Sequence, residues 1–146
     1  EGLKAVPGNF VDMNGKILGT HKGIIHYTIG QRKGLGLAMG HPVFVVDIIP
    51  ETNEVVIGEN ADTFSKELIA DKTNFMSVEH PEDGMQVIGK IRYAHKGVPC
   101  RIYMLDDARV RVVFDEPVRA ATKGQAVVFY ENDYIVGGGT IKEIIR

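Results

Sequence analysis

The chain has 146 residues, of which 44% are hydrophobic and 25% are charged, and its formal net charge is −2 at pH 7. A chain of this length fits one ordinary domain or two small ones. The composition is that of a folded protein and excludes a disordered chain. Because the net charge is slightly negative, the chain as a whole does not attract nucleic acid. A single cysteine, Cys100, excludes an internal disulfide and fits a reducing cytoplasmic compartment, and no apolar run approaches the roughly 20 residues that span a bilayer, so we expect no membrane partner.

The chain begins with Glu1-Gly2-Leu3 and carries no initiator methionine. We therefore expect it to be an excised piece of a larger protein. A comparison of its mass with that of the full gene product tests this expectation.

Two hairpins are predicted in the first half of the chain. Phe10-Val11 and Ile17-Leu18 flank a turn that contains Asn-Gly, the strongest short hairpin signal. The β-branched run over residues 43–49 predicts a strand that returns, after an acidic turn, through residues 55–57. Residues 62–68 give the weakest signal, and a single helical turn and a loop both remain open there.

In the second half, apolar and polar residues alternate along segments separated by turn signals at a spacing of about 8–12 residues, which is typical of a small barrel or sandwich. These segments cover residues 86–93, 100–105, 109–114 and 126–136. We place the domain boundary after Ala70. The predicted fold class is all-β, with a small central β domain at residues 1–70 and a C-terminal β-barrel at residues 71–146.

Charge is unevenly distributed along the chain. No Asp or Glu lies between Asp12 and Asp47, residues 47–83 are rich in acids, and residues 86–105 are again basic and free of acids. In a near-neutral protein this separation predicts a face for an anion, and the commonest large anion is a nucleic-acid backbone. The sequence does not tell whether the two basic stretches converge in space.

The glycine-rich run at residues 30–36 resembles a phosphate-binding loop but fails both common patterns. Leu35 occupies the second glycine position of a Walker loop, Met39 stands where a dinucleotide fingerprint needs its third glycine, and the run leads into a strand rather than a helix. The pattern leaves a loop that presents Gln31, Arg32 and Lys33. It favours neither a phosphate contact nor a solvated basic turn over the other.

Arg92-Tyr93 ends one alternating strand, and this pair is suited to holding a phosphate and stacking on a base. Taken alone, the residues favour a structural role, with Tyr93 in the core and Arg92 in solvent. Gln125 lies in a turn before a strand and by itself indicates little. Cys100 falls on an apolar strand face with Ile102, which predicts a buried thiol rather than a nucleophile.

The remaining polar residues give no catalytic constellation and no metal site, because the five histidines lack ligand spacing and a lone cysteine cannot hold zinc. Asp106-Asp107 is predicted to be a hairpin turn.

The motifs of this chain, taken in order, resemble the C-terminal part of the tRNA-specific 2-thiouridylase family. The most specific match lies at residues 19–23 and 27–36, and further matches follow at residues 42–47, 90–93, 99–100, 113–118, 124–130 and 137–141. Together they span nearly the whole chain. Lys123 departs from the family, which often has proline at that position.

The resemblance implies a parent enzyme that replaces the C2 oxygen of the wobble uridine of tRNA with sulfur. In that family ATP adenylates the base and a cysteine persulfide delivers the sulfur. The ATP loop and both sulfur-handling cysteines lie in an N-terminal domain upstream of the segment resembled here. The resemblance further implies a central β domain and a six-stranded barrel similar to the second domain of translation elongation factors. This chain alone is expected to be inactive and to hold no cofactor.

The family's tRNA contacts carry over to Arg92, Tyr93 and Gln125, while Gln31, Arg32 and Lys33 resemble a segment on the tRNA side. The implied partners are the anticodon arm of tRNA and, for the parent enzyme, a sulfur-carrier protein. An alternative is a docking module that meets such a carrier through the acidic segment at residues 47–83. A third is that the chain binds nothing measurable without the catalytic domain.

Overall fold

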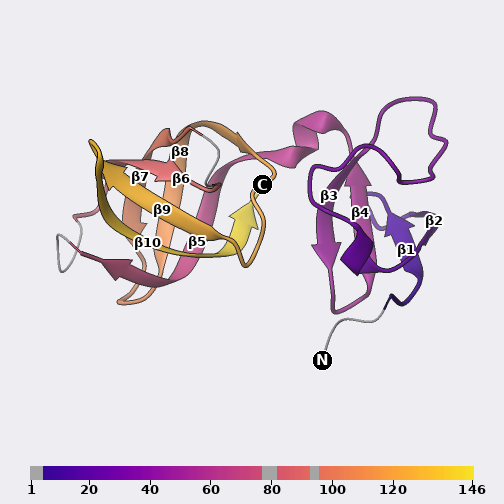
Figure 1. The fold of residues 1–146 in the computed structure, drawn as a ribbon, viewed down its shortest axis with the longest axis horizontal. Coiled ribbons are helices and arrows are strands. Elements are labelled where there is room, and N and C mark those ends of the chain that lie inside the picture. Colours follow the sequence, from indigo (N-terminus) through magenta and orange to yellow (C-terminus); the bar gives the residue numbers. More distant parts are fainter. Residues whose placement is uncertain (1–4, 77–81, 93–95) are drawn as a thin grey trace. The chain divides into compact units, whose positions relative to one another are not determined.

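The computed structural model describes residues 5–76, 82–92 and 96–146, and it divides into two units, Glu1–Phe64 and Ser65–Arg146 (Figure 1). Regular structure in both units is almost entirely strand, which confirms the all-β class predicted from the alternation. Among the described residues, no helix is both long and apolar enough to cross a membrane.

Within its described residues, the first unit contains a four-stranded sheet in the order β2-β1-β4-β3. Its elements are β1 Gly8–Val11, β2 Ile17–His21, the 3-10 helix η1 Ile24–His26, β3 Phe44–Ile49, β4 Glu54–Gly58 and the 3-10 helix η2 Asn60–Thr63. β1 pairs with β2, and β3 with β4, in the two antiparallel hairpins predicted from the sequence. Parallel pairing of β1 with β4 joins the hairpins into one sheet.

The described part of the second unit forms a closed barrel in the order β10-β5-β8-β7-β6-β9. Its strands are β5 Phe64–Phe75, β6 Met85–Lys90, β7 Val98–Met104, β8 Val110–Arg119, β9 Ala126–Glu131 and β10 Tyr134–Ile145. Among the described residues, closure gives each strand a paired neighbour on both sides. The six-stranded barrel implied by the resemblance is therefore confirmed.

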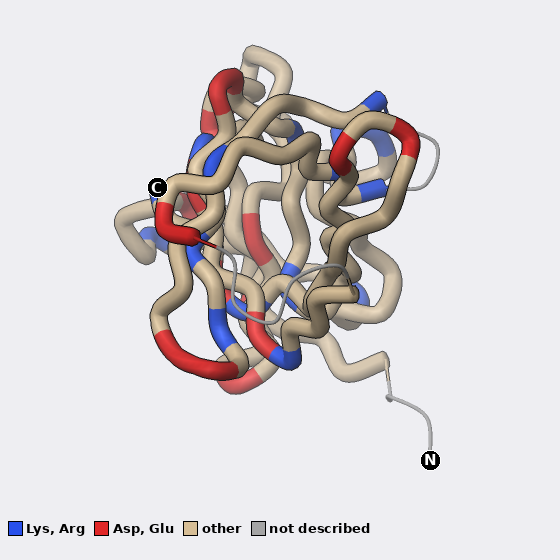
Figure 2. The backbone as a smooth tube through the Cα atoms, turned by 90° about the vertical axis from the view of Figure 1, so that its left-hand side faces the viewer, with Lys and Arg blue, Asp and Glu red and all other residues tan. Residues whose placement is uncertain are grey.

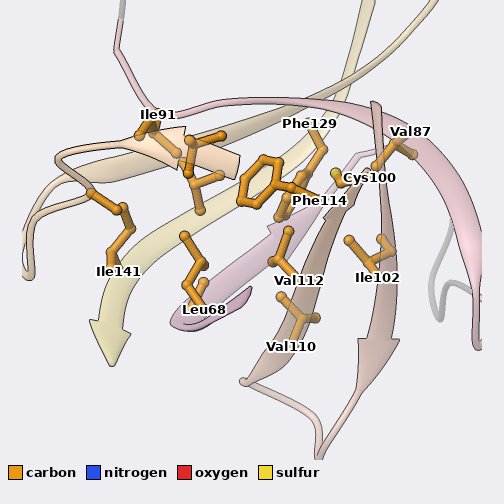
Figure 3. Packing of buried hydrophobic residues seen from close by; sticks show 14 of the residues in the cluster. Leu68, Val87, Ile91, Cys100, Ile102, Val110, Val112, Phe114, Phe129 and Ile141 are labelled. Atoms are coloured by element: carbon orange, nitrogen blue, oxygen red, sulfur yellow. The ribbon is translucent and has the colours of Figure 1, made fainter. Parts of the chain in front are cut away.

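Alternate residues of these strands fill the barrel with apolar side chains (Figure 3). Cys100 is fully buried beside Phe114, as its place on the apolar strand face predicted. Gly89 faces the same region, where an added Cβ would come within 2.9 Å of both the Cys100 Sγ and the Phe114 ring. The interior at this level has no room for even one further methyl group.

The domain boundary predicted after Ala70 falls inside β5, whereas the chain divides after Phe64. Leu68 pairs with Ile144 and Ala70 with Ile141, and both β5 residues are fully buried in the barrel. The strand was missed because its buried positions do not alternate strictly and because charged residues interrupt them. The weak segment at residues 62–68 resolves into the end of η2 followed by this first barrel strand.

Candidate nucleic-acid interface

A hollow of about 400 Å³ lies where β6 ends and β9 begins. It is lined by Lys90, Ile91, Arg92, Gln125, Ala126, Val128 and Tyr130. Pairing of Ile88 with Tyr130 and of Lys90 with Val128 sets the two strands side by side along it. The structure thus brings together Arg92 and Gln125, two predicted contact residues that are far apart in the sequence.

The Arg92 guanidinium is tied to the backbone beside this hollow. Its Nη2 donates to the Ala120 carbonyl at 2.5 Å, and the Thr122 hydroxyl donates to the same oxygen at 3.0 Å. Ala120 has φ of 59°, in the left-handed region that a side chain disfavours. Two hydrogen bonds therefore hold a strained corner, and the guanidinium, which has five N–H donors, keeps further donors for a ligand.

The turn that carries Gln125 is fixed by backbone hydrogen bonds. The Gln125 N–H donates to the Thr122 carbonyl at 3.2 Å, which confirms the predicted turn before a strand. The Gly124 N–H donates to the Ile141 carbonyl, and the Ile141 N–H donates to the Gln125 carbonyl, each at 2.8 Å. These bonds fix the backbone position from which the exposed Gln125 side chain extends.

Tyr93, predicted to contact tRNA, lies outside the described residues. Two described residues of the hollow were not singled out from the sequence: Lys90 supplies a cation, and Tyr130 an aromatic ring that is half-buried. A signal for Tyr130 was present, because it shares with Ala126 and Val128 the strand face opposite the buried Val127 and Phe129.

The three predicted contact residues of the first unit lie on one loop, residues 30–36, called here the basic loop. The Gly30 N–H donates to the Val45 carbonyl at 2.7 Å, and the Val45 N–H donates to the Gln31 carbonyl at 2.9 Å, so that β3 anchors the loop. The Gln31 amide accepts from the Thr28 N–H at 3.0 Å and donates to the Lys33 carbonyl at 2.8 Å.

The Gln31 side chain therefore braces the basic loop, while Arg32 and Lys33 are exposed on it. The side chain of Leu35 is buried and so also anchors the loop. Arg32 also lines a second hollow of about 330 Å³, together with Gly34, Gly36, His41 and neighbouring residues of the same unit. The loop therefore offers two cations on a backbone that is hydrogen-bonded to β3.

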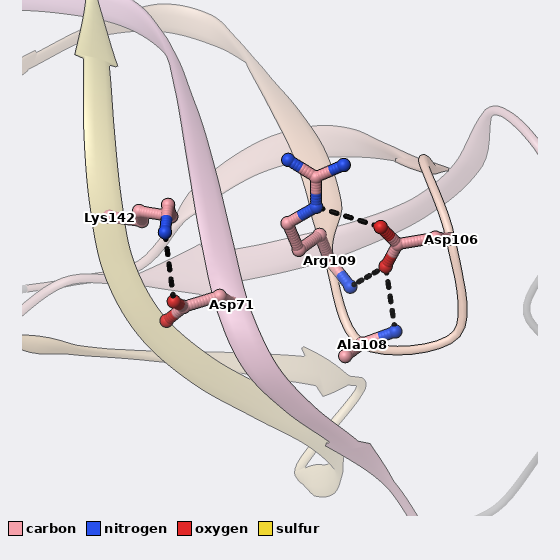
Figure 4. Close-up of polar contacts among 5 residues, drawn as sticks. All are labelled: Asp71, Asp106, Ala108, Arg109 and Lys142. Carbon is pink, nitrogen blue, oxygen red and sulfur yellow. Dashed lines mark hydrogen bonds and ion pairs between the residues drawn. The ribbon is translucent and has the colours of Figure 1, made fainter.

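Several acids of residues 47–83 are occupied by local partners. Glu67 is paired with Arg111, and the Asp83 carboxylate accepts from the Met104 N–H. Asp71 lies 3.8 Å from the Lys142 ammonium (Figure 4). The acids of residues 47–83 are also divided between the two units, and acidic and basic positions are interspersed along the chain (Figure 2). Neither observation favours a single acidic docking surface.

Hydrogen bonding and burial explain the perturbed ionisable groups. The Arg111 guanidinium lowers the pKa of Glu67, and hydrogen bonds from the Ala108 N–H and Arg109 lower the pKa of Asp106 in the β7–β8 hairpin (Figure 4). The same bonds confirm the turn predicted at Asp106-Asp107. Burial raises the pKa of the Cys100 thiol to about 12, so at neutral pH it stays protonated and unreactive.

Comparison with known proteins divides the chain at the same place. Residues 1–59 match the family model described as tRNA methyl transferase PRC-barrel domain, and residues 65–141 match the aminomethyltransferase beta-barrel domain. The two matches lie on either side of Phe64, where the structure separates its two units.

Curated relatives are similar over nearly the whole chain. The tRNA-specific 2-thiouridylase MnmA of Lachnoclostridium phytofermentans is 62% identical over 96% of this chain. The proteins of the same name from Clostridium botulinum strain Alaska E43 and from Acetivibrio thermocellus are 57% and 56% identical over 94% and 93% of it. The chain spans 38–39% of the length of these relatives.

Proposed function

The chain belongs to the tRNA-specific 2-thiouridylase family, and we propose that it forms the part of such an enzyme that positions tRNA. The observation that carries the proposal is the hollow at the barrel rim, which Arg92 and Gln125 both line. Family membership supplies the class of ligand, and the geometry of the hollow supplies the contacts.

The chemistry of the hollow suits a nucleotide at the edge of a folded RNA. Lys90 and Arg92 supply positive charge for a phosphate, and the Tyr130 ring together with Val128 gives an apolar surface for a base or sugar. The Gln125 amide can both donate to and accept from a base edge or a ribose hydroxyl. Tyr93 is proposed as a further stacking residue, and Arg32 and Lys33 of the basic loop as contacts to the RNA backbone.

We place no chemical step on this chain. The proposed parent reaction exchanges oxygen for sulfur at the wobble uridine, and its ATP and its sulfur-carrier partner are assigned to parts of the enzyme outside these residues. The buried thiol of Cys100 cannot carry a persulfide to a substrate in the folded chain. The proposed contribution of this chain is to position the substrate: its phosphate contacts hold the anticodon arm in place while the chemistry occurs elsewhere in the enzyme.

The test is binding of an anticodon stem–loop RNA and of whole tRNA to the 146-residue chain at a low and a high salt concentration. Binding is expected to weaken as salt rises. Arg92→Ala is expected to weaken it about fivefold at low salt, the factor that corresponds to about 1 kcal/mol, and to reduce the salt slope by about one phosphate contact. Gln125→Ala is expected to lower affinity without changing the slope.

Two further variants separate a phosphate contact from a bracing role. Arg92→Lys keeps the charge but loses the planar fork that reaches Ala120, so a retained salt slope identifies a phosphate contact. Arg109→Ala removes the same charge from the β7–β8 hairpin, at the Met85 end of β6 rather than the Lys90 end. If Arg92→Ala and Arg109→Ala lower RNA affinity equally, the hollow contributes no more than any positive charge on the surface. No RNA binding by the wild-type chain would refute the proposal.

A further inference from the structure

His21, the last residue of β2, is only 1% exposed, yet both of its ring nitrogens are hydrogen-bonded. Nδ1 lies 2.9 Å from the Gly23 backbone nitrogen, and Nε2 lies 2.7 Å from the Asn53 carbonyl oxygen. A backbone N–H can only donate and a carbonyl can only accept. Nδ1 is therefore the acceptor and Nε2 carries the proton, so one neutral tautomer satisfies both partners.

Aromatic packing fixes the plane of this imidazole. The ring centroids of Phe10 and Tyr27 each lie 5.7 Å from that of His21 and 5.3 Å from one another, with edge-to-face interplanar angles. The Tyr27 hydroxyl accepts from the Lys22 N–H at 3.1 Å. The hydrogen bond and the ring contacts thus join the two ends of the segment at residues 21–27, which leads into the basic loop.

Asn53 extends the same network to the other hairpin. It lies in the β3–β4 turn with φ of 55°, and its Nδ2 donates to the Val6 and Pro7 carbonyls at 3.0 and 3.2 Å. Gly8 provides the room, because an added Cβ there would lie 2.7 Å from the His21 Nε2. One imidazole thus joins the segment before the basic loop, the β3–β4 turn and, through Asn53, the residues that precede β1.

We propose that His21 is a positioning residue for RNA binding: its neutral ring fixes the segment that leads into the basic loop, so that Arg32 and Lys33 meet the RNA backbone in one geometry. The RNA part of this inference rests on the proposed function. The anchoring part does not, because it concerns hydrogen bonds within the first unit. β3 fixes the far end of the segment through Val45, and His21 fixes the near end.

Two substitutions of His21 each keep one of the two hydrogen bonds of its ring and remove the other. His21→Asn keeps an acceptor near the position of Nδ1 and gives up the bond to Asn53, whereas His21→Gln keeps a donor near the position of Nε2 and gives up the bond to Gly23. His26→Gln is the matched control, because His26 is exposed. The readouts for the 146-residue chain are the imidazole tautomer by nitrogen NMR, amide protection factors at residues 23–36, and affinity for the anticodon stem–loop RNA.

The Nε2–H tautomer is expected in the wild-type chain. His21→Gln is expected to reduce amide protection in the basic loop and to weaken RNA binding about fivefold, the factor expected for one lost hydrogen bond, whereas His21→Asn should change both less.

The outcomes separate the inference from the proposed function. An Nδ1–H tautomer, or loop protection equal in wild type and His21→Gln, would overturn the anchoring role whatever the RNA data show. Reduced protection with unchanged RNA affinity would overturn the positioning role and leave a purely structural anchor. If the wild-type chain binds no RNA, the proposed function and the positioning role fail together, while the tautomer and protection data still decide whether His21 anchors the loop.

Discussion

The two units hold their candidate contact residues by different means. In the barrel, Arg92 and Gln125 extend from strand ends whose positions follow from a closed sheet around an apolar interior. In the first unit, Arg32 and Lys33 lie on a loop that is hydrogen-bonded to β3 through its backbone and braced by the Gln31 amide. Apolar packing is shared among many side chains and fails cooperatively, whereas a polar contact can be lost singly.

This difference teaches where each site is vulnerable. A change deep in the barrel should remove its contact residues together, because their geometry depends on the whole sheet. A change in the loop should loosen one segment and leave the four-stranded sheet in place. The predictions below test this contrast in order of expected effect.

The largest effect is expected for Phe114→Ala. Phe114 is 1% exposed at the centre of the barrel core, and truncating such a ring costs about 3–5 kcal/mol of unfolding free energy through lost burial and a residual cavity. Denaturant unfolding of the second unit, followed by NMR signals of barrel residues, measures the loss. Leu105→Ala is the control, because Leu105 is 44% exposed in the β7–β8 hairpin and should cost less than about 0.5 kcal/mol.

A loss below about 1 kcal/mol for Phe114→Ala would mean that the barrel is not held by its interior. Concurrent loss of the NMR signals of β1 and β4 would contradict the division of the chain into two separately stabilised units.

A smaller and more local effect is expected for Gln31→Ala. The substitution removes two side-chain hydrogen bonds within the loop, each worth about 0.5–1.5 kcal/mol. Amide protection should fall around Thr28 and Lys33, while the denaturant midpoint of the sheet changes little. Arg32→Ala is the control, since Arg32 is exposed and should leave loop protection unchanged. Unfolding of the whole sheet in Gln31→Ala would erase the contrast between the two units.

The parts of the fold that were predicted correctly depend on neighbours in the sequence. Alternation and turn residues located both hairpins and the later barrel strands, and short turns join β1 to β2, β3 to β4 and β7 to β8. The parallel pairing of β1 with β4 and the closure of the barrel by β5 join distant segments, and no local pattern encodes them.

The same limit applies to the candidate contact residues. Arg92 and Gln125 could be proposed one by one, but their shared hollow results from strand pairing between β6 and β9. Gln31 is predicted to contact RNA, and its amide also braces the loop through hydrogen bonds with two backbone groups, which the sequence alone did not indicate. His21 gave no signal by spacing, since its partner Asn53 belongs to the other hairpin.

The smallest effect is expected for Glu67→Gln, and it isolates surface charge from the apolar interior of the barrel. Arg111 lowers the pKa of Glu67, so the ionised carboxylate stabilises the folded state above the ordinary glutamate pKa of about 4.3, and this contribution disappears as pH falls through the lower folded-state pKa. For a pair this exposed, Glu67→Gln should cost about 0.5 kcal/mol at neutral pH. Urea unfolding from pH 7 to pH 3 should show the difference from wild type shrinking toward zero in acid. A difference that stayed constant across this range would mean that Glu67 stabilises the barrel through packing rather than through its charge. Contacts on the outside of the barrel would then behave like its apolar interior, and unlike the single polar contacts that hold the basic loop.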